Sequence, residues 1–155
     1  MNSTMPICDY EGSQYATEFW TSKRRYEDLA ERVALKKILP PRGERIAEIG
    51  AGAGRLAELY AGYDEVILMD YAHSVLVEAR QRWGRDARFR FVAADVYRLP
   101  FVPGAFDTVV MVRVMHHLAK VSLALSQIVP TLRPGATFVV EYANKRNLKA
   151  IARWL

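Results

Sequence analysis

Residues 45–55, Arg-Ile-Ala-Glu-Ile-Gly-Ala-Gly-Ala-Gly-Arg, decide the fold of this 155-residue chain. The apolar residues up to Ile49 predict a short buried strand, and the three glycines after it predict a tight turn. A helix is expected to begin next, at Leu56. Glycine permits positive φ and leaves no Cβ between the backbone and a ligand, and a helix start presents free amides and a positive dipole end. The stretch is therefore typical of a nucleotide-binding turn in a doubly wound α/β fold.

Two details indicate which nucleotide-like ligand this turn suits. Dinucleotide-binding turns have the spacing G-x-G-x-x-G, whereas Arg55 occupies the place of the third glycine here. Glu48 lies at the carboxyl end of the predicted strand, where a carboxylate would repel a pyrophosphate. S-adenosylmethionine carries an ammonium and a sulfonium and has no phosphate, so the sequence favours this cofactor over NAD.

Composition and charge describe an ordinary globular domain. Apolar residues make up 51% of the chain and charged residues 25%, and the length predicts a single domain. The single cysteine, Cys8, excludes an internal disulfide and favours a cytoplasmic location. The first ten residues do not resemble a signal peptide, and no apolar run reaches membrane-spanning length.

The net charge of +5 does not predict a nucleic-acid partner. Most of the excess lies in residues 145–155, which contain four basic side chains and no acid, and the rest of the chain is nearly neutral. The basic residues are therefore interpreted as a solvated terminal feature rather than a domain-wide field.

The region before the first strand predicts a helix that covers the sheet. Its inward face is expected to consist of Tyr26, Ala30, Val33, Ala34 and Ile38, which follow helical spacing. Aromatic residues before it offer a second interpretation, a lid over the cofactor. We expect residues 1–39 to form this cover or lid and residues 40–155 to form a Rossmann-like core, together one domain.

Four further strands follow the glycine turn. They are predicted at residues 66–69, 89–92, 106–112 and 136–141, with helices at 75–83 and 120–132 and an amphipathic helix at the end of the chain. Asp70 ends the second strand, twenty residues beyond Gly50, where an acid can accept hydrogen bonds from both ribose hydroxyls. Asp70 and Ser74 also precede a helix, so an N-cap is the alternative; spacing favours the ribose role.

These motifs together resemble class I S-adenosylmethionine-dependent methyltransferases. The resemblance rests on residues 48–54, Asp70 and Ala94-Asp95, and on Leu99-Pro100-Phe101 and His116-His117-Leu118 after it. It is closest to the broad family that includes the ubiquinone and menaquinone C-methyltransferases, and it covers roughly residues 40–145. Ala72 departs from the serine that this family often has there.

The resemblance implies a role for each site residue. Glu48 and the backbone of Gly50, Ala51 and Gly52 would hold the methionine part of the cofactor. Asp70 would accept from the ribose, Tyr71 would pack on the adenine, and Asp95 and the Val96 amide would contact its polar edge. Arg113 and Val114 would line the methyl-donor end of the crevice. Asp107 is expected to order structure, and no metal ligands are predicted.

Methyl transfer needs a general base only if the acceptor must lose a proton. His117 is the candidate catalytic residue, since it follows the fourth strand at the crevice; the alternative is that His116 and His117 pack against and cap the next helix. The chain lacks the Asn/Asp-Pro-Pro-aromatic tetrad of adenine and glutamine methyltransferases, and Cys8 is remote from the crevice. A small-molecule acceptor is therefore expected, with S-adenosylhomocysteine as the product.

The family's sheet normally has seven strands, and about five are predicted here. The sequence is therefore interpreted as C-terminally truncated, with its fifth strand an open edge through which the chain could self-associate. Three functions stay open: a methyltransferase, a non-catalytic S-adenosylmethionine-binding or interaction domain, and a nicotinamide-dependent oxidoreductase. Arg55 and Glu48 disfavour the third.

Overall fold

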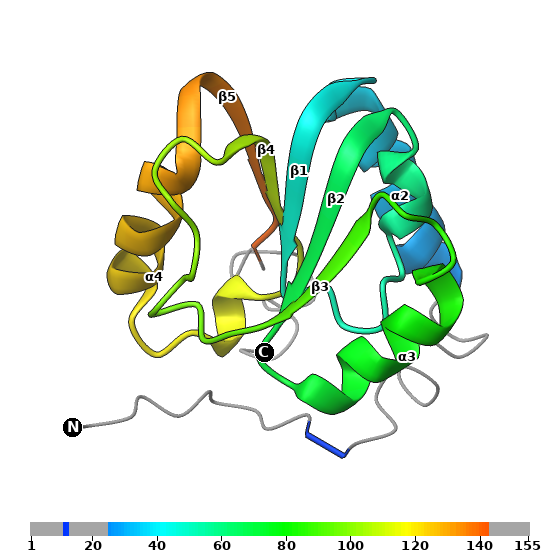
Figure 1. The fold of residues 1–155 in the computed structure, drawn as a ribbon, viewed down its shortest axis with the longest axis horizontal. Coiled ribbons are helices and arrows are strands. Elements are labelled where there is room, and N and C mark those ends of the chain that lie inside the picture. The colour runs from blue at the N-terminus through cyan, green and yellow to red at the C-terminus, as the bar shows by residue number, and fades with distance from the viewer. Residues whose placement is uncertain (1–10, 13–24, 143–155) are drawn as a thin grey trace, which may run out of the picture.

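The computed structural model describes residues 11–12 and 25–142 and contains one sheet of five parallel strands (Figure 1). The strands are β1 (Gly43–Ile49), β2 (Tyr63–Asp70), β3 (Phe89–Ala93), β4 (Phe106–Met111) and β5 (Leu132–Val140). Their order across the sheet is β3-β2-β1-β4-β5. The predicted doubly wound α/β fold is confirmed.

Successive side chains of each strand point to opposite faces of the sheet, so they pack into two hydrophobic cores, one on each face. Ile46, Val66 and Leu68 belong to the core under α2 (Arg25–Ile38) and α3 (His73–Trp83). Ala47, Ile67 and Met69 belong to the core under α4 (Val121–Ile128). Helices therefore cover both faces, as Figure 1 shows with α3 and α4 on opposite sides.

The sheet has its topological switch point at β1. The chain runs outward from β1 through β2 to β3, then returns to the other side of β1 to form β4 and β5. In open α/β sheets, ligands bind in the crevice at the carboxyl ends of the strands beside this point. The switch point therefore places a crevice directly above Ile49, where the glycine turn begins.

The helix predicted after the glycine turn is wrong in kind. The structure has only a four-residue 3₁₀ helix, Ala57–Tyr60, in this place. Arg55, just before it, is held by ion pairs to Asp28 and Glu31 on α2, and the chain turns away toward β2. A single short 3₁₀ turn has no extended dipole to attract a ligand. Any backbone hydrogen bonds to a ligand at this place would therefore come from the amides of the glycine turn itself.

The predicted inward face of α2 is also wrong. Tyr26, Val33 and Ile38 are 81%, 55% and 56% exposed, and Ala30 and Ala34 are exposed as well. Leu35 on the opposite face is the buried residue of the helix, followed by Leu39 just beyond it. The helix turns its charged residues, not its apolar stripe, toward the rest of the molecule, because Asp28, Glu31 and Arg32 pair there.

Smaller differences affect the second half of the chain. The helix expected over 120–132 divides into α4 and a 3₁₀ helix, Val129–Thr131, which contains Pro130. The fifth strand, expected over 136–141, begins earlier: Arg133-Pro134-Gly135 lie within β5, where the pairing register shifts between Phe106↔Leu132 and Thr108↔Thr137. Gly135 has φ 79° at this irregularity. The final amphipathic helix and the aromatic lid at residues 15–20 lie outside the described residues.

Candidate functional site

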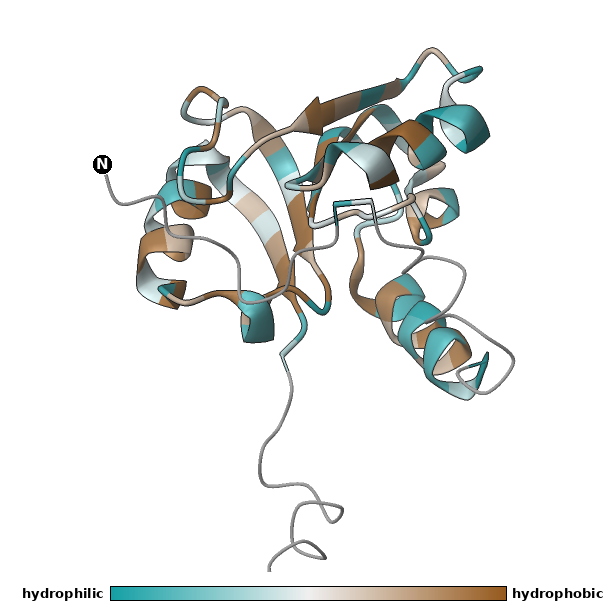
Figure 2. Cartoon of the chain, turned by 90° about the horizontal axis from the view of Figure 1, so that it is seen from below, coloured by the Kyte–Doolittle hydropathy of each residue, from teal (hydrophilic) through white to brown (hydrophobic). Residues whose placement is uncertain are grey.

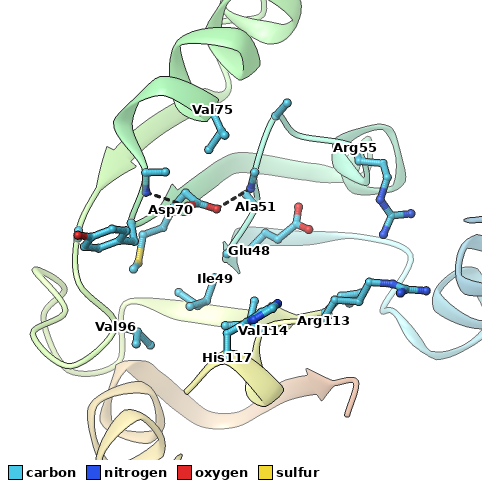
Figure 3. A pocket seen from close by; sticks show the side chains of 18 of the residues that line it. Glu48, Ile49, Ala51, Arg55, Asp70, Val75, Val96, Arg113, Val114 and His117 are labelled. Atoms are coloured by element: carbon cyan, nitrogen blue, oxygen red, sulfur yellow. Dashed lines mark hydrogen bonds between the residues drawn. The ribbon is translucent and has the colours of Figure 1, made fainter. Parts of the chain in front are cut away.

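A cavity of about 260 Å³ lies at the carboxyl ends of β1, β2 and β4 (Figure 3). Every site residue predicted from the sequence lines it: Glu48, Gly50, Ala51, Gly52, Asp70, Tyr71, Asp95, Val96, Arg113, Val114 and His117. The structure thus brings together residues spread over seventy positions of the chain. It adds lining residues that the sequence did not predict: Ile49, Ala53, Arg55, Leu56, Met69, Ala72, Val75, Arg82, Ala94, Tyr97, Val112 and Leu118.

Three positive φ angles shape the glycine turn. Gly50, Gly52 and Gly54 have φ of 77°, 54° and 72°, a region that residues with a Cβ rarely adopt. The Gly50 and Ala51 amides both donate to the Met69 carbonyl, at 2.8 and 2.9 Å, and so anchor the turn to β2. A Cβ on Gly50 would lie 2.2 Å from Val114 Cγ2, so this glycine is needed for the β4 loop to approach.

Gly54 takes over the packing role that dinucleotide sites give to their last glycine. A Cβ there would lie 2.9 Å from the Trp83 ring, and the Gly54 carbonyl accepts a hydrogen bond from Trp83 Nε1 at 3.0 Å. The end of α3 therefore packs directly on the turn. The spacing G-x-G-x-G thus achieves close helix packing with Arg55 in place.

Asp70 connects the glycine turn to the start of α3. Its Oδ2 accepts from the Gly52 amide at 2.7 Å and its Oδ1 from the Ala72 amide at 3.0 Å. Burial raises the pKa of Asp70, and these backbone amides offset part of that shift. The carboxylate is thus held in place between two pocket-lining segments.

The N-cap alternative for Asp70 and Ser74 is not what the structure contains. α3 has Ala72 at its N-cap position, without a side-chain capping bond. The Glu11 carboxylate instead accepts from the His73 and Ser74 amides, at 2.8 and 3.2 Å. A residue sixty positions away therefore satisfies the free amides of this helix.

Glu48 is buried in the wall of the cavity with only 3% of its surface exposed. Its Oε2 has no hydrogen-bond partner among the described residues. Burial raises the pKa of Glu48 to about 8, and the nearby Tyr60 hydroxyl and the Arg55 charge only partly offset this. Burial therefore favours the protonated acid at neutral pH, whereas a cation placed beside Glu48 would favour the carboxylate.

Arginines from two different segments lie at the same end of the cavity as Glu48 (Figure 3). Arg55 pairs with Asp28 and, at 2.6 Å, with Glu31, and Glu31 also pairs with Arg113. Arg113 has φ 59°, the one positive value of a non-glycine residue in the described ranges. Glu31 thus joins the glycine turn, the β4 loop and α2. No sequence motif predicts this arrangement; the nearest signal is a pair of acids, Asp28 and Glu31, one helical turn apart.

Asp70 and Val96 lie toward the opposite end of the cavity (Figure 3), and Tyr71, which follows Asp70, also lines the cavity. Tyr71 is 49% exposed, so its ring presents an accessible face. Asp95 Oδ1 accepts from the Tyr97 amide at 2.9 Å, which fixes the loop after β3. This end combines apolar side chains with the acids Asp70 and Asp95 and suits a purine nucleoside.

His117 lines the cavity, whereas His116 is exposed outside it. Their ring centroids are 3.9 Å apart. Burial, together with the neighbouring His116, lowers the pKa of His117, which favours the neutral form able to accept a proton. The pair does not cap α4, whose N-cap residue is Lys120; the Lys120 amide donates to the Tyr97 hydroxyl at 3.0 Å.

Asp107 lies at the other end of the sheet from this cavity. Its Oδ2 accepts from the Glu44 amide at 2.6 Å and from Arg133 Nη2 at 3.0 Å. These contacts join the starts of β1, β4 and β5, which fits the structural role expected from the sequence. Within the described ranges, no three potential metal ligands cluster and no helix is long and apolar enough to cross a membrane.

The strand order, the G-x-G-x-G turn and the acids ending β1 and β2 define a class: the class I S-adenosylmethionine-dependent methyltransferase fold. A family model described as "Methyltransferase domain" matches residues 47–140, more than half of the chain. The chain belongs to this methyltransferase family.

Relatives and a solved structure agree with this assignment. The chain is 34% identical over 122 residues to a demethylmenaquinone methyltransferase of Thermus thermophilus, covering 76% of this chain and 52% of that protein. It is 32% identical over 111 residues to the enzyme of the same name from Clavibacter sepedonicus, covering 70% and 45%. A Thermotoga maritima structure, titled an S-adenosylmethionine-dependent methyltransferase and possible histamine N-methyltransferase, superposes with a TM-score of 0.76 at 22% identity, covering 94% and 65%. The chain spans about half the length of the curated relatives it matches.

Proposed function

We propose that the chain binds S-adenosylmethionine in this cavity and transfers its methyl group to a small-molecule acceptor. The observation that carries the proposal is the buried Glu48 carboxyl, whose Oε2 lacks a partner in the described structure and faces the cavity. A buried polar atom without a partner is costly. The ammonium of a methionine group would satisfy it and convert the acid to a carboxylate.

The other residues fit the rest of the cofactor. Asp70 would accept from the ribose hydroxyls while its two backbone bonds hold it in place. Tyr71 would pack on the adenine, with Asp95 and the Val96 amide at its polar edge. Gly50, Ala51 and Gly52 allow the backbone to approach, and Arg113 and Val114 border the methyl-donor end. When bound, the cofactor supplies an electrophilic methyl group on its sulfonium.

The chain's own contribution to the reaction is mostly positional. The walls of the cavity would exclude water and align the acceptor with the methyl group, which supplies much of the acceleration in such reactions. His117, held in a neutral form, would accept a proton where the acceptor must lose one. That role makes His117 the proposed catalytic residue.

Two relatives support the acceptor class. Both are named demethylmenaquinone methyltransferases, and a small apolar acceptor of that kind is what we propose for this chain. A nucleic-acid partner is not proposed. The single-domain organisation and the cytoplasmic location remain predictions, the latter resting on the single cysteine.

Titration calorimetry with S-adenosylmethionine, S-adenosylhomocysteine, NAD and NADP tests the cofactor. We expect binding of the first two alone. Tighter binding of NAD than of S-adenosylhomocysteine would overturn the proposal in favour of an oxidoreductase.

A second assay distinguishes an enzyme from a binding module. Transfer of a labelled methyl group from S-adenosylmethionine to a demethylmenaquinone analogue is expected. Tight cofactor binding without transfer to this or other small acceptors would favour the non-catalytic alternative.

A further inference from the structure

Helix α2 is amphipathic, and its apolar stripe points away from the molecule. The side chains that point away from the molecule are Tyr26, Leu29 and Val33, which are 81%, 51% and 55% exposed. Ala30 and Ala34 extend this exposed face. An apolar stripe on the outside of a helix is a common feature of interaction surfaces.

The acids of α2 are directed inward. Asp28 pairs with Arg32 and Arg55, and Glu31 pairs with Arg55 and Arg113. The third acid of the helix, Glu27, is only partly exposed. Pairing with the cavity arginines therefore removes two of the three negative charges of α2 from its outer surface and fixes which face points outward.

The outer surface of α2 retains its basic residues. Arg25, Lys36 and Lys37 are all exposed. At helical spacing Lys37 falls within the apolar arc, and Arg25 and Lys36 lie along one edge of it, whereas Glu27 lies at the other edge. The basic run continues in sequence with Lys23 and Arg24. Figure 2, where α2 is the helix at the lower right, shows it projecting from the sheet with brown apolar and teal polar residues.

We propose that the outer face of α2, defined by Tyr26, Leu29, Ala30, Val33 and Ala34 with Lys37 within it and Arg25 and Lys36 along one edge, docks on an anionic lipid surface. Apolar side chains inserted at the headgroup boundary, with Lys and Arg against anionic headgroups, are how interfacial helices bind membranes. The length of the helix suits this, since fourteen residues extend about 21 Å along the surface.

Charge disfavours a second copy of the chain as the occupant of this face. Two α2 helices packed antiparallel would place Arg25 of each beside Lys36 and Lys37 of the other, and parallel packing would set identical cations side by side. Like charges at such an interface oppose association. An anionic headgroup layer complements the same residues. This proposal does not depend on methyl transfer.

Vesicle flotation with the full chain tests the proposal. We expect the chain to float with phosphatidylcholine vesicles containing phosphatidylglycerol, and to bind pure phosphatidylcholine vesicles at least about tenfold more weakly. Raising the salt concentration should release it from the anionic vesicles. Absence of binding to anionic vesicles would overturn the proposal.

Matched variants assign the binding to α2. Leu29→Glu/Val33→Glu should abolish flotation, and Lys36→Glu/Lys37→Glu should remove the preference for anionic vesicles. The control is Val102→Glu/Val129→Glu, which replaces two valines that are 68% and 56% exposed in other elements; it should float like the parent. Circular dichroism and S-adenosylhomocysteine binding check that each variant is folded.

Two outcomes would contradict the assignment. One is that the control variant loses flotation as completely as Leu29→Glu/Val33→Glu, since binding would then be non-specific. The other is a dimer in solution that Leu29→Glu/Val33→Glu converts to monomer, since the face would then join two copies of the chain.

Discussion

Glu48 is a buried acid whose charge depends on what lies beside it. Because its pKa is about 8 in the absence of ligand, binding of an ammonium group must release a proton at neutral pH. We therefore propose that the residue selects its ligand by coupling binding to ionisation. A pyrophosphate would keep the acid protonated, whereas an ammonium group favours its ionised form.

The first prediction concerns the pH dependence of cofactor binding. Affinity for S-adenosylhomocysteine should rise between about pH 6 and about pH 8 and then level, because ionised Glu48 is the form that binds. Calorimetry in buffers of different ionisation enthalpy should detect proton release. Glu48→Gln should weaken binding, abolish the proton release, and create no affinity for NAD.

The same shift predicts how the ligand-free chain responds to pH. The pKa of Glu48 is raised above its ordinary value of 4.5, so the folded state loses stability as pH rises from about 4.5 to about 8. Glu48→Gln should reduce this loss in thermal unfolding experiments. A pH dependence identical to that of the parent chain would contradict the assigned pKa.

A further prediction concerns Asp70. Asp70→Ala should weaken S-adenosylhomocysteine binding by roughly ten- to a hundredfold, the scale of hydrogen bonds to a charged group. Loss of the bonds to Gly52 and Ala72 should also reduce the order of the turn. Asp70→Asn keeps one acceptor oxygen, so its affinity for S-adenosylhomocysteine should lie between those of the parent chain and Asp70→Ala. Calorimetry and thermal unfolding separate the effects, and unchanged affinity in both variants would remove Asp70 from the site.

At the scale of elements, the glycine turn depends on close packing against α3. Gly54→Ala combines a φ of 72° with a Cβ contact of 2.9 Å to Trp83. Gly104→Ala is the matched control, since its φ is 67° and its nearest neighbour lies 4.0 Å away. We expect Gly54→Ala to lose about 1–3 kcal/mol more in urea unfolding than the control. Equal losses would mean that Trp83 moves freely and the turn is not constrained.

The strands could be predicted because parallel strands buried on both faces leave continuous apolar runs such as residues 66–69. Most of the lining residues were implied by the resemblance to the methyltransferase family, and the topology brings them together at the carboxyl ends of β1, β2 and β4. The orientation of α2 could not be predicted, since both its apolar stripe and its Leu35 side follow helical spacing. The orientation of α2 depends on ion pairs between Glu31 and arginines more than twenty residues away. A local sequence pattern cannot contain such long-range pairs.

At the scale of the whole molecule, β5 is the outer strand of the described sheet beyond β4. No described strand pairs with its other side, and it carries Phe138, Val139 and Val140. Unpaired apolar edges recruit other chains. We therefore predict concentration-dependent self-association in light scattering, which Leu29→Glu/Val33→Glu leaves intact because it alters α2 and not β5. A monodisperse monomer would contradict this prediction.

The central claim is that one cavity holds S-adenosylmethionine between Glu48 and Asp70. A crystal structure of the chain with S-adenosylhomocysteine tests it most directly. The account predicts the ligand's ammonium at Glu48, its ribose hydroxyls on Asp70 and its adenine between Tyr71 and Asp95. A ligand bound elsewhere, or bound in this cavity with its ribose away from Asp70, would contradict it.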